Sequence, residues 1–183
     1  MKNFSKSATT VAGAILLGAT CLTAAGLASA ADAAATQRIL SYWDMVKLTA
    51  RTEAPLEAAK AATEKYRDIN VAVAEGFVQG SPDVPGEGFH YLNPNRLDCK
   101  FEPGKPEILL YAILPGHTKP QLVSLEYAIP YACLPADGPP PKGFAGGLDV
   151  WHNDEPVPFW TVNAWLYLKN PDGLFTLENP NVP

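Results

Sequence analysis

The sequence predicts an α+β fold in which N-terminal helices pack on a single antiparallel β-sheet. Two observations carry this prediction. Apolar residues recur at helical spacing early in the chain, whereas 17 of the 18 prolines fall in residues 82–183 and exclude long helices there. Between those prolines lie apolar runs of strand length. We therefore expect one globular domain over residues 31–183, helical over 31–80 and β-rich over 81–183.

The first 30 residues have the pattern of an export signal. Two lysines near the start precede an uncharged stretch over residues 11–27, and Ala28-Ser29-Ala30 places small residues where signal peptidase cuts. We expect cleavage after Ala30 and an exported protein, periplasmic or extracellular, with no stable membrane insertion. The alternative is a retained membrane anchor, because residues 11–30 carry no charge.

Two helices are expected before residue 81. In residues 37–50 the apolar positions recur every three or four residues, which predicts a helix. A second helix should begin at Pro55, since proline suits the first helical position. Its apolar stripe runs from Leu56 to Phe77, and a glycine at 76 or 80 should end it.

Strands are expected in the proline-rich part. The apolar runs Glu107–Leu114 and Gln121–Ile129 flank a loop rich in turn residues, so they should form an antiparallel hairpin. Residues 160–168 predict a third strand. The turn sequence NPDG at 170–173 precedes Leu174-Phe175, which would form a short final strand.

The cysteine content predicts an oxidising compartment, and the net charge argues against one class of partner. After cleavage the chain would keep two cysteines, Cys99 and Cys133, and such a pair in an exported protein predicts one disulfide. Two buried free thiols are the alternative. Without residues 1–30 the chain has 12 Lys and Arg against 19 Asp and Glu, a net charge of −7. An acidic chain without a basic cluster argues against nucleic acid as a partner.

Several short motifs occur together in a fixed order. They are YRD at 66–68, EGF at 75–77, GFHYLNP at 88–94, PEILLY at 106–111, LEY at 125–127, NPDGLF at 170–175 and NP at 179–180. This set resembles a family of small secreted bacterial proteins to which no activity is assigned, and the match covers residues 56–181. The resemblance implies export and a compact domain. In that family a histidine usually stands where this chain has Asn163.

Glu126 is the unusual residue of its predicted strand. Strict alternation places it on one face with Leu122, Ser124 and Ala128. A carboxylate on a largely apolar face needs a partner, or an altered protonation state, if that face is covered. The alternative is that this face is wet and Glu126 is solvated.

Four further residues complete the candidate site. His90 follows a glycine-rich approach, His152 lies in an acidic segment, and Asn163 and Trp165 share one face of the third strand. With Glu126 they predict a polar ligand pocket against the sheet. His90, Glu126 and His152 also form a donor set that suits a divalent metal, the one cofactor the sequence offers. A purely structural role for these groups is the third interpretation.

These residues favour an exported, non-enzymatic domain that binds a small ligand or a metal. One alternative is a small metal-dependent hydrolase or oxidoreductase that uses the His/Glu cluster, and another is a structural envelope protein. The chain has no GxSxG elbow, Walker loop or dinucleotide-binding glycine motif. The sequence makes no prediction of the oligomeric state.

Overall fold

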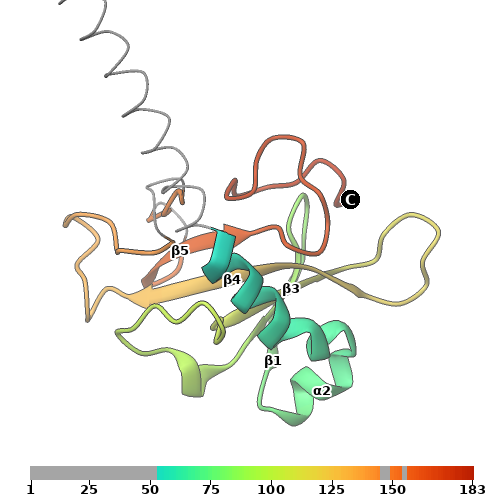
Figure 1. The fold of residues 1–183 in the computed structure, drawn as a ribbon, viewed down its shortest axis with the longest axis horizontal. Helices are drawn as coiled ribbons and strands as arrows, with labels where there is room; N and C mark the ends of the chain where they lie inside the picture. Colours follow the sequence, from blue (N-terminus) through green and yellow to red (C-terminus); the bar gives the residue numbers. More distant parts are fainter. Residues whose placement is uncertain (1–52, 145–148, 154–155) are drawn as a thin grey trace, which may run out of the picture. The chain divides into compact units, whose positions relative to one another are not determined.

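A computed structural model describes residues 53–144, 149–153 and 156–183. Within these ranges five strands form one antiparallel sheet in the order β1-β2-β3-β4-β5, so each strand pairs with the next one along the chain. They are β1 (Val78–Val84), β2 (Gly88–Leu92), β3 (Ile108–Ala112), β4 (Gln121–Pro130) and β5 (Phe159–Ala164) (Figure 1). The predicted α+β class is confirmed. The predicted export signal and the helix expected over residues 37–50 lie outside the described residues.

Helical segments cover one face of the sheet. Residues 53–63 are helical and lead into the 3-10 helix η1 (Glu64–Arg67) and then α2 (Ile69–Ala74), drawn in teal in Figure 1. Their buried side chains Ala59, Tyr66 and Ala72 join one hydrophobic cluster with residues of β3, β4 and β5. We call this side of the sheet the helix face. A second 3-10 helix, η2 (Pro94–Arg96), follows β2.

The helix predicted to run continuously from Pro55 to Phe77 is wrong beyond residue 63. Asp68 adopts an extended conformation and its side chain accepts a hydrogen bond from the Asn70 backbone N–H at 3.0 Å. This aspartate caps a new helix, because a short acidic side chain competes with the helical backbone for the same donors. The expected stop signal is confirmed at Gly76, which has φ 94°.

The first two strands were not predicted, because β1 contains glycine, serine and proline and β2 is short. The turn between them has Pro85 and Gly86 at its centre, and the Glu87 N–H donates to Val84 O at 3.0 Å. Gly86 has φ 80°, as the third position of a type II turn requires. At Gly88 a Cβ would lie 2.3 Å from Tyr111 O, so only glycine lets β2 approach β3 this closely.

The hairpin of β3 and β4 is confirmed, but a bulge changes which residues share a face. Tyr111 pairs with Leu122 and Leu110 with Ser124, which leaves Val123 as an extra residue on β4. Leu122 therefore packs in the cluster on the helix face, opposite Glu126, and the prediction that these two share a face is wrong. Strict alternation cannot hold across a bulge.

The C-terminal residues follow the last strand differently from the prediction. The strand expected over residues 160–168 ends at Ala164, and Trp165 N–H donates to Leu174 O at 3.0 Å. Leu174 and Phe175 lie in a turn instead of a strand. Val182 is buried in a second hydrophobic cluster with Ile108, Leu110 and other residues on the opposite face of the sheet. We call this side the pocket face.

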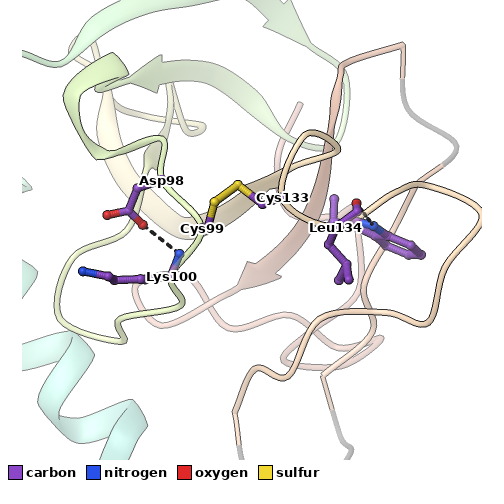
Figure 2. The surroundings of a disulfide bond; sticks show 6 residues. Asp98, Cys99, Lys100, Cys133 and Leu134 are labelled. Atoms are coloured by element: carbon purple, nitrogen blue, oxygen red, sulfur yellow. Dashed lines mark hydrogen bonds between the residues drawn. A yellow bond between two sulfur atoms is a disulfide. The ribbon is translucent and has the colours of Figure 1, made fainter.

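The predicted disulfide is confirmed. Cys99 and Cys133 are bonded, with their Cα atoms 5.4 Å apart (Figure 2). The bond links the segment between η2 and β3 to the turn that follows β4. It therefore joins the two chain segments at the open end of the β3–β4 hairpin. In the residues described, no helix has the length and apolar character needed to cross a membrane.

Candidate functional site

A pocket of about 250 Å³ opens on the pocket face of the sheet. Most of its wall is apolar and comes from Val84, Leu92, Ile108, Val157 and Leu177 with their neighbours. Its polar wall residues are Ser81, Glu87, His90, Glu126 and Thr161. An apolar pocket with a few convergent polar groups is the usual form of a small-molecule site.

Strand register brings two of the predicted residues into this pocket. His90 of β2 pairs with Leu110 of β3, and Glu126 of β4 pairs with Ile108 of β3. Directly paired residues point to the same face, and so do residues two positions apart on one strand. His90 and Glu126 therefore share the pocket face although a strand separates them.

His90 lies between two carboxylates. Its Nε2 is 3.2 Å from Glu87 Oε2 and 3.5 Å from Glu126 Oε2. Both glutamates are buried, with 8% of Glu87 and 4% of Glu126 exposed. On the other side of the ring, Nδ1 is 3.0 Å from Ser81 Oγ. The imidazole is thus held at both nitrogens.

The neighbours of His90 favour its protonated form. Ser81 Oγ donates to Pro82 O at 2.8 Å, so its lone pairs remain to accept from His90 Nδ1–H, while Nε2–H points at Glu87. Burial by itself lowers the pKa of His90. The hydrogen bond with Glu87 and the charges of Glu126 and Glu87 outweigh burial, and the pKa is raised above 6.5.

Ser81 contacts a histidine without being set up as a nucleophile. Its hydroxyl accepts from the His90 backbone N–H at 3.1 Å and donates to Pro82 O, at the place where the β1–β2 register shifts. The Ser81 hydroxyl therefore replaces a backbone hydrogen-bonding group where the β1–β2 pairing is irregular. A nucleophilic serine would instead donate to the imidazole.

Two buried polar atoms on this face have no hydrogen-bond partner in the described part of the chain. They are Thr161 Oγ1 and Asn163 Oδ1, on residues that are 2% and 1% exposed. Asn163 is directly opposite Glu126 in the sheet, and its Nδ2 donates to Leu177 O at 2.6 Å. Thr161 lines the pocket. Native proteins pair nearly all such groups, so each unpaired one needs an explanation.

The structure places the other predicted residues around the pocket and not in its wall. His152 forms a backbone bridge with Thr161, which puts both on the same face. Trp165 packs in the cluster of the pocket face, and its indole N–H donates to Thr176 O at 2.7 Å. Of the five residues predicted to bind a ligand, His90 and Glu126 line the pocket, and Asn163, His152 and Trp165 do not.

The predicted metal set of His90, Glu126 and His152 is not found as a metal site. Among residues 53–144, 149–153 and 156–183, no three His, Cys, Asp or Glu side chains are arranged to hold a metal ion.

Sequence reasoning missed Glu87, which is closer to His90 than Glu126 is. The signal was present: Glu87 stands between Gly86 and Gly88, three residues before His90, where a turn followed by a strand directs both side chains to one place. A glutamate in such a loop is usually solvated, and the burial of this one is evident only from the folded structure.

Comparisons with known proteins identify no relative. No protein-family model, curated protein or solved structure matches this chain. The resemblance to a family of small secreted bacterial proteins stays a prediction, and the function has to be inferred from the geometry of the site.

Proposed function

We propose that this protein is an exported, non-enzymatic domain that binds a small ligand in the pocket beside His90 and Glu126. The leader pattern of residues 1–30 supports export, and the Cys99–Cys133 disulfide is compatible with an oxidising compartment. The motif resemblance to secreted bacterial proteins supports the same location.

One observation carries the binding proposal. The pocket has apolar walls, and the buried hydroxyl of Thr161 in its lining has no hydrogen-bond partner in the described residues. Its volume of about 250 Å³ lies just below the range of about 300–1,000 Å³ that is usual for drug-sized ligands. The ligand is accordingly a small molecule.

The same geometry supports binding over catalysis. The hydroxyl that is hydrogen-bonded to the imidazole belongs to Ser81 and donates to Pro82 O. The imidazole is in turn engaged with Ser81 and with carboxylates. General acid–base chemistry needs a group free to exchange a proton with a substrate, and a nucleophile needs an activating base. Nothing in the described residues favours the alternative of a metal-dependent hydrolase or oxidoreductase.

Gly80 offers a direct test, because the pocket exists partly through its missing side chain. A Cβ at Gly80 would have no neighbour closer than 3.7 Å, and one of the two atoms at that distance is Leu92 Cβ in the pocket wall. Gly80→Val should therefore fold, since valine suits a strand, and should fill part of the pocket. We expect it to abolish binding of small apolar fragments in a ligand-observed NMR screen of the wild-type protein.

A matched control comes from the same strand. Gln79 pairs with Tyr91, whose ring packs against the cluster on the helix face, so Gln79→Val adds a similar apolar group away from the pocket. This variant should bind the fragments as the wild type does. Equal binding by Gly80→Val and the wild type, or no fragment that binds the wild type, would sink the proposal.

A further inference from the structure

All five strands of the sheet contribute residues to the pocket. They are Gly80 of β1, Leu92 of β2, Ile108 of β3, Glu126 of β4 and Phe159 of β5. Because β1 and β5 are the two outer strands, residues of both can meet at one cavity only if the sheet curls around its pocket face. The cavity therefore belongs to the sheet itself and not to a surface loop.

One buried polar group in this cavity is left without a partner. Thr161 lines the pocket and is 2% exposed, and its Oγ1 has no hydrogen-bond partner in the part of the chain that the structure describes. Its direct neighbour across the sheet is Ala128, which packs in the hydrophobic cluster of the pocket face, so the Thr161 side chain lies on that face as well. A buried hydroxyl without a partner costs free energy, and a ligand that supplies the partner would recover it.

The charged groups of the pocket are already engaged. Glu87 Oε2 is 3.2 Å and Glu126 Oε2 is 3.5 Å from His90 Nε2, and neither carboxylate is without a partner. The described lining contains no lysine or arginine that could pair with an anion. A charged head group would lose its water against walls that are mostly apolar, without gaining an unengaged counter-charge. The ligand that fits is therefore uncharged.

The polar neighbours of Thr161 restrict which uncharged group fits. Glu126 is two residues from Ala128 on β4, so it is a diagonal neighbour of Thr161 on the pocket face. An ionised carboxylate only accepts hydrogen bonds, and its two oxygens offer about four lone-pair sites, so it can accept from a ligand in addition to the partners it has. A ligand carbonyl or ether oxygen would face this acceptor without a hydrogen to donate. A hydroxyl can accept from Thr161 and donate to the carboxylate.

We propose that the pocket binds a small uncharged alcohol, a hydroxyl group on an apolar body. This inference rests on the proposed binding function and names the chemical class of the ligand. The Thr161 hydroxyl donates to the ligand oxygen, and the Glu126 carboxylate accepts the hydrogen of the ligand. The apolar body lies against Leu92, Ile108 and Leu177. Burial of that body supplies most of the binding free energy, and the two hydrogen bonds select the head group.

Four probes with six carbon atoms separate the possible head groups. They are 1-hexanol, its isomer 1-methoxypentane, hexanoate and n-hexylammonium. We expect 1-hexanol to bind the full-length protein about fivefold more tightly than 1-methoxypentane, because the ether has no hydrogen to donate. Hexanoate and n-hexylammonium should bind more weakly than 1-hexanol. Protein-observed NMR titrations at pH 6, below the raised pKa of His90, measure the dissociation constants and show whether the shifted residues line the pocket.

Two variants at Thr161 connect the preference to its hydroxyl. Thr161→Val removes the hydroxyl with little change of shape and should weaken the binding of 1-hexanol about fivefold. Thr161→Ser keeps the hydroxyl and is the matched control, which should bind 1-hexanol as the wild type does. Circular dichroism checks that both variants fold, and the comparison of 1-hexanol with its ether isomer decides the class if Thr161→Val does not. Equal affinity of folded Thr161→Val and the wild type for 1-hexanol would contradict the proposal.

The outcomes also distinguish this inference from the binding function beneath it. If hexanoate, n-hexylammonium or 1-methoxypentane binds in the pocket as tightly as 1-hexanol, the pocket is a ligand site but the class of ligand is wrong. If none of the four probes shifts a pocket residue, the class is overturned, and the fragment screen with Gly80→Val decides the binding function separately.

Discussion

The two faces of one sheet differ in whether a buried hydroxyl is left without a hydrogen-bond partner. On the helix face the buried hydroxyls are paired: Tyr111 Oη donates to Tyr66 O at 2.6 Å, and Thr63 Oγ1 donates to Ala59 O at 2.7 Å. On the pocket face Thr161 Oγ1 has no partner in the described residues, although Thr161 is as well buried. Both faces are built on the same strands, so the backbone does not account for the difference.

The difference separates the face of the sheet that stabilises the fold from the face that we propose binds a ligand. Unpaired buried groups cost free energy, and natural proteins tolerate them mainly where a ligand or a catalytic task uses them. The helix face carries the closed core with its aromatic pairs, whereas the pocket face combines a smaller cluster with a cavity and a carboxylate pair. The predictions below test that division.

The largest change in the free energy of unfolding is expected at Leu125 of β4, and the neighbouring Ser124 provides the comparison. Leu125 is fully buried on the helix face, and Leu125→Ala should lower the free energy of unfolding by about 2–5 kcal/mol through lost burial and a cavity. Ser124 is also fully buried but points to the pocket face, where its hydroxyl donates to Leu125 O at 3.1 Å. Ser124→Ala should cost no more than about 1 kcal/mol. Urea denaturation measures the free energy of unfolding of both variants, and equal losses would contradict the difference between the two faces.

Substitution of a buried glutamate just before β3 should give the next largest change in the free energy of unfolding, and here the change is an increase. Glu107 is 2% exposed and its Oε2 accepts the Ala128 N–H at 3.0 Å. Burial raises the pKa of Glu107 to about 8, against a partial opposing effect of that hydrogen bond. The folded state therefore holds a proton that the unfolded state releases above about pH 4.5, so stability falls as pH rises from about 4.5 to 8.

Glu107→Gln keeps an acceptor for Ala128 N–H and removes the titration. Its free energy of unfolding at pH 7 should exceed that of the wild type by about 3 kcal/mol. Chemical denaturation at pH 5 and pH 8 is the measurement, with Glu102→Gln, a partly exposed carboxylate in a salt bridge with Lys105, as the control. A Glu107→Gln protein that is less stable than the wild type at pH 8 would show that the carboxylate is needed in its charged form.

The titration of His90 should also make the protein less stable as pH rises, by a smaller amount than the titration of Glu107. Its pKa is raised in the folded protein, so its contribution to stability is full below the unfolded value near 6.5 and is lost as pH rises through the folded value. Because Glu107 titrates in the same range, His90 has to be followed individually by NMR of its ring protons. Glu87→Gln should lower the pKa of His90, and a pKa unaffected by that change would remove Glu87 from the cluster.

The sequence predicted the regular parts of this fold and failed where local geometry departs from an average pattern. The β3–β4 hairpin and the disulfide follow from apolar runs, a turn-rich loop and an isolated cysteine pair. β1 was missed because its composition, VQGSPDV, is that of a loop, and it is a strand only through pairing with β2. The bulge at Val123 leaves no signature in the sequence, yet it decides which side chains accompany Glu126.

The site was predictable in part for the same reason. Glu126 stands out as a polar residue in an apolar strand, and His90 as a histidine after a glycine-rich approach. The register of three strands then brings them together. Glu87 and Thr161 do not stand out, because a glutamate in a turn and a threonine in a strand are ordinary. Their burial depends on the C-terminal segment and on contacts far apart in the chain.

Two threonines test the contrast between the faces most directly. Thr63 Oγ1 is paired with Ala59 O at 2.7 Å and with Tyr167 Oη at 2.8 Å, whereas Thr161 Oγ1 is unpaired in the described residues and Thr161 lines the pocket. Thr63→Val and Thr161→Val remove the same hydroxyl with little change of shape. The measurement is the free energy of unfolding of both variants, together with their affinity for a probe, a small hydroxyl-bearing fragment that binds the wild-type pocket.

Thr63→Val should lose about 1–3 kcal/mol of stability and bind the probe as the wild type does, because it leaves hydrogen-bond partners unsatisfied away from the pocket. Thr161→Val should keep or gain stability and bind the probe more weakly. If Thr161→Val instead loses as much stability as Thr63→Val and binds the probe unchanged, its hydroxyl is structural and the division between the two faces is contradicted.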